Sequence, residues 1–260
     1  MLRFLGTFLL FCLFFGNCRA SGLSEIVIPN DTIETSDVFE DSITYNYYRF
    51  RPTQLIAPGI LLAAGVAGVW GFDGIKESVR HHFAGKHPTS ADNYLEFVPY
   101  AGYFGLGFIP GVEHRSDWRE RLMAGLTSYA VVVVVNNIMK ITFREPRPGT
   151  GQKNSFPSGH TATAFAGAEL MRIEYGNWVG VAGYVVAVTV GALRIYNDRH
   201  WINDIIGGAA VGILSARIGY WLVPFERKLF GLEKKKSPAA LAIVPVASHA
   251  GGAISVALTF

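Results

Sequence analysis

Three short segments of the sequence contain most of the residue types that could do chemistry. They read KITFREPRP at Lys140–Pro148, PSGH at Pro157–His160 and RIYNDRHWIND at Arg194–Asp204. Together they place several cations and two histidines within 65 residues of a largely apolar stretch. This combination favours a site that binds a phosphate group without a metal ion and transfers it through a histidine.

The cations of the first and third segments suit phosphate binding. A phosphoryl group in transfer spreads negative charge over three oxygens, so catalysis depends on positioning and electrostatic stabilisation. Arg147 and Arg194 each offer a planar fork that matches phosphate oxygens, and Lys140 adds a point charge. The sequence has no Asp/Glu cluster and no His-x-x-x-His pair that would form a metal cage. We therefore expect no metal ion and no other cofactor.

The second segment is expected to begin a helix. Ser158 is a good N-cap residue, and Gly159 allows a ligand to approach the backbone closely. The free N–H groups of a helix start bind anions, and His160 lies in the first turn beside them. This position suits a general acid that protonates a leaving oxygen. Taken alone, His160 is more simply interpreted as a capping residue.

His200 and Asp204 are four residues apart, so they share a face if the segment is helical. A carboxylate that hydrogen-bonds one imidazole nitrogen fixes the tautomer and leaves the other nitrogen free. Such an imidazole can attack phosphorus and form a phosphohistidine. Taken alone, the pair is equally well explained as an ordinary feature of a helix start.

The composition indicates a membrane protein built from helices. Of the 260 residues, 50% are hydrophobic and 17% are charged, against roughly 25% charged residues in soluble domains. The 29 glycines suit helices that pack through small residues. The net charge is +3, and no basic run is interleaved with aromatic residues, so we expect no nucleic-acid partner.

We expect an all-α membrane bundle of about six spans followed by a short strand-like C-terminal tail. The candidate spans are Thr53–Phe72, Tyr94–Pro110, Leu122–Ile141, Gly159–Ile173, Trp178–Ile195 and Ile202–Val223. Gly74–Phe83 alternates apolar and charged residues in a pattern that indicates a helix lying at the membrane interface. Within the spans, Glu169 and Arg172 are spaced to form a pair, whereas the sequence offers no evident partner for Arg217.

The N-terminal residues 1–20 have the pattern of a secretory signal peptide. Arg3 is followed by the eleven-residue apolar run Leu5–Phe15, and the sequence around Ala20 fits a cleavage site. An uncleaved anchor is the alternative interpretation. Both cysteines, Cys12 and Cys18, lie in this segment. Its cleavage would exclude disulfides and thiolate chemistry from the rest of the chain.

Three further regions follow this segment. We expect residues 21–52 to form a polar, acidic, extracytoplasmic lead, residues 53–230 the membrane domain, and residues 231–260 a basic linker with a tail. In the tail, Ile254, Val256, Leu258 and Phe260 alternate with small residues, which is strand periodicity. Leu241–Val246 is the candidate partner strand of a hairpin. Two strands cannot form a barrel, so we expect a small hairpin or a mobile tail.

The K-x6-RP, PSGH and R-x5-H-x3-D spacings resemble those of the type 2 phosphatidic acid phosphatase family, which shares its site with the vanadium haloperoxidases. The resemblance covers about residues 95–223. It implies an α-helical bundle and metal-independent hydrolysis of phosphate monoesters or pyrophosphates, often on lipids. The family usually has a serine before the arginine of the third segment, where this chain has Leu193.

The resemblance also implies a role for each residue of the site. Lys140, Arg147 and Arg194 would hold the phosphate, and Ser158 and Gly159 would bind it through a hydroxyl group and the backbone. In the same way, His160 would be the general acid, His200 the nucleophile, and Asp204 the residue that orients His200.

The substrate class follows from the resemblance and from the expected envelope location. Lipid A phosphatases and undecaprenyl pyrophosphate phosphatases are the subclasses we expect, with phosphatidic acid or phosphatidylglycerophosphate as further substrates. The alternatives are a vanadate-dependent haloperoxidase and a non-enzymatic transporter or scaffold. We expect a lipid phosphate and the bilayer as partners, with headgroup contacts from residues 74–93 and 111–121. The sequence indicates no protein partner.

The membrane face of the site is the least determined feature. A cleaved signal peptide followed by six crossings would place the site in the cytoplasm. The positive-inside rule, applied to Arg227, Lys228 and Lys234–Lys236 after the last span, favours the opposite face. We expect a protein of the Gram-negative inner membrane whose site faces the periplasm, with an association of the tail with the outer membrane as an alternative.

Overall fold

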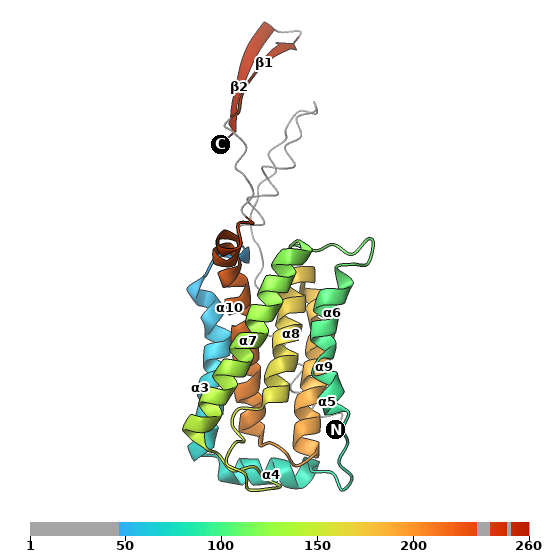
Figure 1. The fold of residues 1–260 in the computed structure, drawn as a ribbon, viewed down its shortest axis with the longest axis vertical. Coiled ribbons are helices and arrows are strands. Elements are labelled where there is room, and N and C mark those ends of the chain that lie inside the picture. The colour runs from blue at the N-terminus through green and yellow to red at the C-terminus, as the bar shows by residue number, and fades with distance from the viewer. Residues whose placement is uncertain (1–46, 233–239, 249–250, 260) are drawn as a thin grey trace. The chain divides into compact units, whose positions relative to one another are not determined.

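The computed structural model of the chain describes residues 47–232, 240–248 and 251–259 (Figure 1). The expected signal peptide, most of the acidic lead and both cysteines lie outside these residues. The described residues up to Pro224 form one unit, and those from Phe225 onwards form a second.

The first unit is built from helices. In chain order they are η1 (Pro52–Leu55), α3 (Ile56–Trp70), α4 (Asp73–Phe83), α5 (Asp92–Leu95), α6 (Val98–Leu106), α7 (Trp118–Phe143), α8 (Gly159–Tyr175), α9 (Asn177–Tyr196) and α10 (Ile202–Leu229). Four helical segments of the described chain are long and apolar enough to cross a membrane, namely Pro52–Trp70, Trp118–Phe143, Asn177–Tyr196 and Ile202–Leu229. The chain is an integral membrane protein with a helical bundle, as its composition predicts.

Two of the six expected spans correspond to shorter helices that are not among these four candidates. Helix α6 has 9 residues and α8 has 17, and a membrane crossing takes roughly 17–25. Helix α8 is the central helix of the unit, and it packs against α6, α7 and α9. Most of its residues are buried, including Ala162, Ala164, Ala166 and Ala168. Since α8 is enclosed by neighbouring helices, it needs no polar face.

Small residues bring α8 and α10 close together. A Cβ atom at Gly212 would lie 2.4 Å from the carbonyl oxygen of Ala162 and 2.8 Å from the backbone nitrogen of Ala166. The backbones of the two helices therefore touch at this crossing, which only glycine permits. This contact holds the first half of α10 against the first half of α8.

A charged network lies inside the bundle around Glu169, which is 1% exposed. Its carboxylate accepts hydrogen bonds from Arg172 at 2.6 and 2.8 Å and from the hydroxyl group of Tyr184 at 2.6 Å. Arg217 reaches the same carboxylate at 2.8 Å. The expected pair of Glu169 and Arg172 is present. The expectation that Arg217 has no partner is wrong, because the partner is 48 residues away in the sequence and only the packing of α8 against α10 brings it near.

The three chemistry-bearing segments lie at one end of the bundle. Figure 1 shows that α7 and α9 end, and α8 and α10 begin, at the same end, where the amphipathic helix α4 lies across the bundle. At this end, the side chain of Trp201 donates a hydrogen bond to the carbonyl group of Pro146 at 2.8 Å. The first and third segments are therefore in direct contact.

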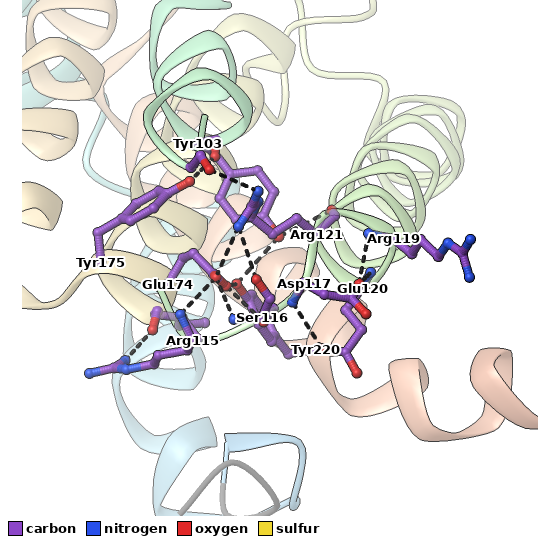
Figure 2. Close-up of polar contacts among 12 residues, drawn as sticks. Tyr103, Arg115, Ser116, Asp117, Arg119, Glu120, Arg121, Glu174, Tyr175 and Tyr220 are labelled. Carbon is purple, nitrogen blue, oxygen red and sulfur yellow. Dashed lines mark hydrogen bonds and ion pairs between the residues drawn. The ribbon is translucent and has the colours of Figure 1, made fainter. Parts of the chain in front are cut away.

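The opposite end of the bundle is closed by a second polar cluster (Figure 2). The carboxylate of Glu174, near the end of α8, accepts hydrogen bonds from the backbone N–H groups of Arg115 and Ser116 at 3.0 and 2.7 Å. It also accepts hydrogen bonds from the hydroxyl groups of Ser116 and Tyr220, at 2.9 and 2.5 Å. Arg121, on α7, donates to the carbonyl group of Ser116 at 2.9 Å. This network ties the loop before α7 to α8 and α10.

The second unit contains a two-stranded antiparallel sheet. Strand β1 (Ala240–Ser248) pairs with β2 (Gly251–Thr259), and the register runs from Ala240 opposite Thr259 to Ser248 opposite Gly251. The two strands include the segments whose alternating pattern predicts strands, apart from Phe260, which lies outside the described residues.

The contact between α8 and α10 predicts the outcome of a glycine substitution. We expect Gly212→Ala to destabilise the fold by about 1–3 kcal/mol, because the new methyl group overlaps the backbone of α8. The matched control is Gly59→Ala, because a Cβ atom at this glycine of α3 has no neighbour within 4 Å. Alanine favours helices over glycine by about 1 kcal/mol, so the control should be neutral or stabilised. Thermal unfolding in detergent measures both, and equal midpoints would contradict the prediction.

Candidate active site

The structure brings the predicted cations and histidines together at the end of the bundle where α8 begins. The ammonium group of Lys140 lies 4.0 Å from the position that a Cβ atom of Gly159 would occupy. The charges of Lys140, Arg147 and Arg194, which we call the cationic triad, are close enough to act on one another and on His200. The three segments therefore form one site.

His200 and Asp204 form a buried pair at the start of α10. Nδ1 of His200 lies 3.1 Å from Oδ2 of Asp204, and the two residues are 2% and 0% exposed. The same oxygen accepts hydrogen bonds from the backbone N–H of Trp201 at 2.8 Å and from the hydroxyl group of Ser155. His200 precedes the helix and Asp204 lies in its first turn. The spacing alone suggested a pair along one helix face. In the structure the pair instead joins the residue before the helix to the first helical turn.

The environment of His200 keeps its imidazole neutral. Burial and then the positive charges of Arg194, Arg147 and Lys140 place the pKa of His200 well below its usual range. A neutral imidazole that donates Nδ1–H to Asp204 keeps the lone pair on Nε2. This is the protonation state of a nucleophile.

Neighbouring side chains hold two members of the cationic triad, Arg147 and Arg194, in place. Arg147 lies in the loop after α7, where its Nε donates to the side chain of Asn154 at 2.7 Å. Its pKa is lowered, first by burial and then by the charge of Arg194. Arg194 lies in the last turn of α9, and one of its terminal nitrogens pairs with Asp92. The cations repel one another, so a bound phosphate would relieve this repulsion.

The start of α8 provides backbone groups for the same anion. Ser158 is the N-cap residue, as predicted, and its hydroxyl oxygen accepts hydrogen bonds from the hydroxyl group of Thr161 at 3.0 Å and from the backbone nitrogen of Thr161 at 3.5 Å. The backbone N–H of Ser158 donates to the carbonyl group of Asp204 at 3.1 Å. Gly159 and His160 are the first helical residues, whose N–H groups have no acceptor within a helix. They are the N–H groups that can face a phosphate.

His160 lies beside the cationic triad and contacts the segment before α6. Its Nε2 is 2.9 Å from the side-chain oxygen of Asn93 and 3.4 Å from Glu96. Burial and then the charge of Arg194 lower the pKa of His160 to about 4. Burial raises the pKa of Glu96 to about 7. A bound phosphate that neutralises Arg194 would favour the protonated imidazole that a general acid requires.

His160 and Arg194 open into a cavity of about 500 Å³. It is lined by Pro88, Thr89, Ser90, Asp92, Asn93, His160, Arg194, Asn197 and Arg199. The lining confirms that part of the predicted headgroup segment, residues 74–93, lies at the site. The same prediction for residues 111–121 is wrong. That loop is bound to Glu174 at the other end of α8, roughly 25 Å away at 1.5 Å per residue (Figure 2).

The segment that carries the cavity lining is fixed to the third motif. The side chain of Asn197 accepts a hydrogen bond from the N–H of Thr89 and donates one to its carbonyl group, both at 2.8 Å. Arg80, on α4, forms a two-pronged contact with Asp198 at 2.8 and 3.0 Å. Helix α4 and the loop after it are therefore held over the site by the turn between α9 and α10.

Several polar residues of the site were not found by sequence reasoning. Ser155 and Glu145 lie within or next to the motifs, but their spacing from Asp204 gives no signal of contact. Asp92 and Glu96 come from a segment about 100 residues before the third motif. Among the described residues, no group of three or more His, Cys, Asp or Glu side chains is placed to hold a metal ion.

The described residues thus define an integral membrane protein whose bundle holds a cationic site with two histidines at one end. Residues 121–228 match the model of the PAP2 superfamily. These residues form a PAP2 superfamily domain, and the resemblance inferred from the three motifs is confirmed.

Three curated proteins are similar to parts of this chain. A lipid A 1-phosphatase of Porphyromonas gingivalis is 43% identical over 155 residues, which are 58% of this chain and 34% of that protein. The bacitracin transport permease protein BcrC of Bacillus licheniformis is 37% identical over 85 residues, 32% of this chain and 41% of that protein. An undecaprenyl-diphosphatase of Sulfolobus acidocaldarius is 34% identical over 68 residues, 26% of this chain and 32% of that protein. The chain spans less than half the length of each relative.

The geometry of the cationic triad predicts an effect on anion binding. We expect Arg194→Gln to weaken the binding of inorganic phosphate by about tenfold or more, because a charged hydrogen-bond donor is lost from a buried site. Arg119→Gln is the control, because Arg119 is exposed at the opposite end of the bundle. Isothermal titration calorimetry of the purified variants measures the affinities. Unchanged binding by Arg194→Gln would show that this arginine does not contact the anion.

Proposed function

We propose that this protein is a membrane-bound, metal-independent phosphatase that hydrolyses a lipid phosphate monoester or pyrophosphate through a phosphohistidine intermediate. The observation that carries the proposal is the neutral, buried His200, bonded to Asp204 and placed close to three cations. Cations that lie close to one another repel, so the arrangement favours a site that binds an anion.

The first chemical step forms the phosphohistidine. The cationic triad binds the phosphate oxygens, and Nε2 of His200 attacks the phosphorus atom while the bond to the lipid oxygen breaks. His160 donates its proton to the leaving oxygen. Asp204 stabilises the positive charge that develops on the imidazole of His200.

The second step releases the phosphate. A water molecule attacks the phosphorus atom, His160 accepts a proton from it, and the bond between phosphorus and Nε2 breaks. His200 returns to its neutral form, and the cationic triad stabilises the charge on the phosphate oxygens in both steps. In this scheme His160 alternates between acid and base, as a two-step displacement requires.

A lipid A phosphate or undecaprenyl pyrophosphate is the substrate that we propose, with phosphatidic acid and phosphatidylglycerophosphate as further candidates. The names of two relatives, a lipid A 1-phosphatase and an undecaprenyl-diphosphatase, support this choice. The polar lining of the cavity beside His160 and Arg194 offers hydrogen-bond partners for a headgroup. The partners are accordingly the lipid substrate and the bilayer.

We further propose that the protein lies in a Gram-negative inner membrane with its site facing the periplasm. Helix α10 begins at the site and ends with Arg227 and Lys228, which the basic run Lys234–Lys236 follows in the sequence. Basic residues next to a span favour the cytoplasmic side. A cytoplasmic end of α10 leaves its beginning, and thus the site, on the other side.

The proposed mechanism predicts activity in the presence of a chelator. We expect the purified protein to release phosphate from a lipid phosphate in EDTA, vanadate to inhibit the reaction, and His200→Ala to lower kcat by roughly 1,000-fold or more. His114→Ala is the control, because this histidine is exposed in the loop at the other end of the bundle. Activity that is lost in EDTA and restored by magnesium would rule out the metal-independent mechanism.

The two leading substrates predict different changes in the cell envelope. Loss of the protein should leave an additional phosphate on lipid A if lipid A is the substrate, and should raise undecaprenyl pyrophosphate if that lipid is the substrate. Mass spectrometry of envelope lipids from cells with and without the protein distinguishes the two. Complementation with His200→Ala should fail to restore either lipid.

A further inference from the structure

A buried carboxyl group lies directly behind the His200–Asp204 pair. Glu145 follows α7 in the first motif and is 4% exposed. It accepts hydrogen bonds from the side-chain amide of Asn203 at 3.2 and 2.9 Å, and the ammonium group of Lys76 lies 3.4 Å away. The proposed reaction steps do not use Glu145, although it stands next to Asp204.

The two oxygens of Asp204 have unequal surroundings. Oδ2 faces the three donors already described, whereas Oδ1 is buried and receives no hydrogen bond from any donor among the described residues. A buried carboxylate oxygen without a donor is costly, and such groups are rare in folded proteins. No N–H group and no Ser, Thr or Tyr hydroxyl group of the described residues donates to Oδ1 of Asp204. A protonated carboxyl group is the remaining kind of donor.

Glu145 can be this donor. Two residues place Glu145 beside Asp204. Asn203, the neighbour of Asp204 in the chain, donates to the carboxylate of Glu145. Ser155 donates its backbone N–H to the carbonyl group of Glu145 at 2.9 Å and its hydroxyl group to Asp204. The charges of the two carboxyl groups also act on one another. Two ionised carboxylates are both acceptors and repel one another, so a hydrogen bond between them requires that one carries a proton. A hydrogen bond from Glu145 to Oδ1 of Asp204 would therefore place a shared proton behind the catalytic pair.

We propose that Glu145 is a positioning residue whose protonated carboxyl group donates a hydrogen bond to Oδ1 of Asp204 and so holds Asp204 ionised and aimed at His200. This inference rests on the proposed phosphatase function and adds a third member to the His200–Asp204 pair. Glu145 acts through Asp204 and does not touch the substrate.

The neighbours of the two carboxyl groups indicate which one carries the proton. The donors at Oδ2 of Asp204 stabilise its negative charge. Among the described residues, Lys76 is the one cation that forms an ion pair with Glu145, at 3.4 Å. The ammonium group of Lys76 lies closer to Asp73, at 2.8 Å. The pKa of Glu145 is raised to about 8, first by burial and then by the charge of Asp204. Glu145 is therefore protonated at neutral pH.

The proposal predicts that kcat falls at alkaline pH. Below the raised pKa, Glu145 keeps its proton and supports Asp204. As the pH rises through that value, Glu145 ionises and places a second negative charge beside Asp204, which loses its donor at Oδ1. The orientation of His200 then weakens and kcat falls.

Two substitutions separate this role from a structural one. In Glu145→Gln, the amide N–H replaces the carboxyl proton and cannot be lost, while the amide oxygen still accepts from Asn203 or Lys76. We expect activity to be retained at neutral pH and the fall in kcat near pH 8 to shift to higher pH. Glu145→Ala removes the donor at every pH, so we expect kcat to fall by about 10- to 100-fold at neutral pH with little change in KM.

The control is a buried glutamate at the other end of the bundle. Glu174→Gln changes the fully buried carboxylate of the cluster in Figure 2, which is remote from the site. We expect it to lower the thermal unfolding temperature, while the shape of its pH profile should match that of the unchanged protein. Full profiles of kcat against pH, on a lipid phosphate in EDTA with folded protein in detergent, give the comparison.

The outcomes separate this inference from the proposed function. An inactive unchanged protein, or an active His200→Ala variant, contradicts the phosphatase proposal itself. With those two results as expected, an unshifted alkaline limb in Glu145→Gln overturns the role of Glu145. Equal losses of kcat in Glu145→Gln and Glu145→Ala at neutral pH also overturn it, because they would mean that the ionised carboxylate is needed.

Discussion

Placing a carboxylate in a protein interior is costly unless it receives hydrogen bonds, and the bonds that Asp204 receives at Oδ2 organise the whole site. Its Oδ2 gathers the backbone of Trp201, the hydroxyl group of Ser155 and the imidazole of His200. Its own carbonyl oxygen accepts from the backbone of Ser158, the cap of α8. One residue thereby links the second and third motifs, and it fixes both the nucleophile and the helix start that faces the anion.

The two ends of α8 show how differently polar groups are used within one bundle. At its C-terminal end, Glu174 is saturated with donors from Ser116, Arg115 and Tyr220, and the cluster only stabilises packing. At its N-terminal end, Lys140 and Arg147 repel one another, and no carboxylate in the described part of the chain forms an ion pair with either. The fully paired end supplies the rigidity that holds the charged end in an arrangement that is unfavourable without a ligand.

Local spacing in the sequence was enough for the parts of the site that depend on local geometry. The cap at Ser158 and the contact of His200 with Asp204 follow from separations of a few residues. Arg217 with Glu169 and Arg194 with Asp92 could not be found, because these contacts exist only once helices pack. Which of the expected spans face lipid was likewise not readable from the sequence. An apolar run such as that of α8 has the same appearance whether it faces lipid or is enclosed by neighbouring helices.

Helix α4 has one side directed at the site and another left uncovered. Lys76 is buried against Glu145, whereas Ile75, beside it, and Phe72, just before the helix, are 55% and 58% exposed. An apolar surface on the helix that lies across this end of the bundle suits a molecule whose acyl chains stay in the bilayer while its headgroup is processed. Such a substrate would reach the enzyme by lateral diffusion in the plane of the membrane. Turnover would then follow the mole fraction of the lipid in the membrane, and diluting it with inert lipid would slow the reaction even at constant bulk concentration.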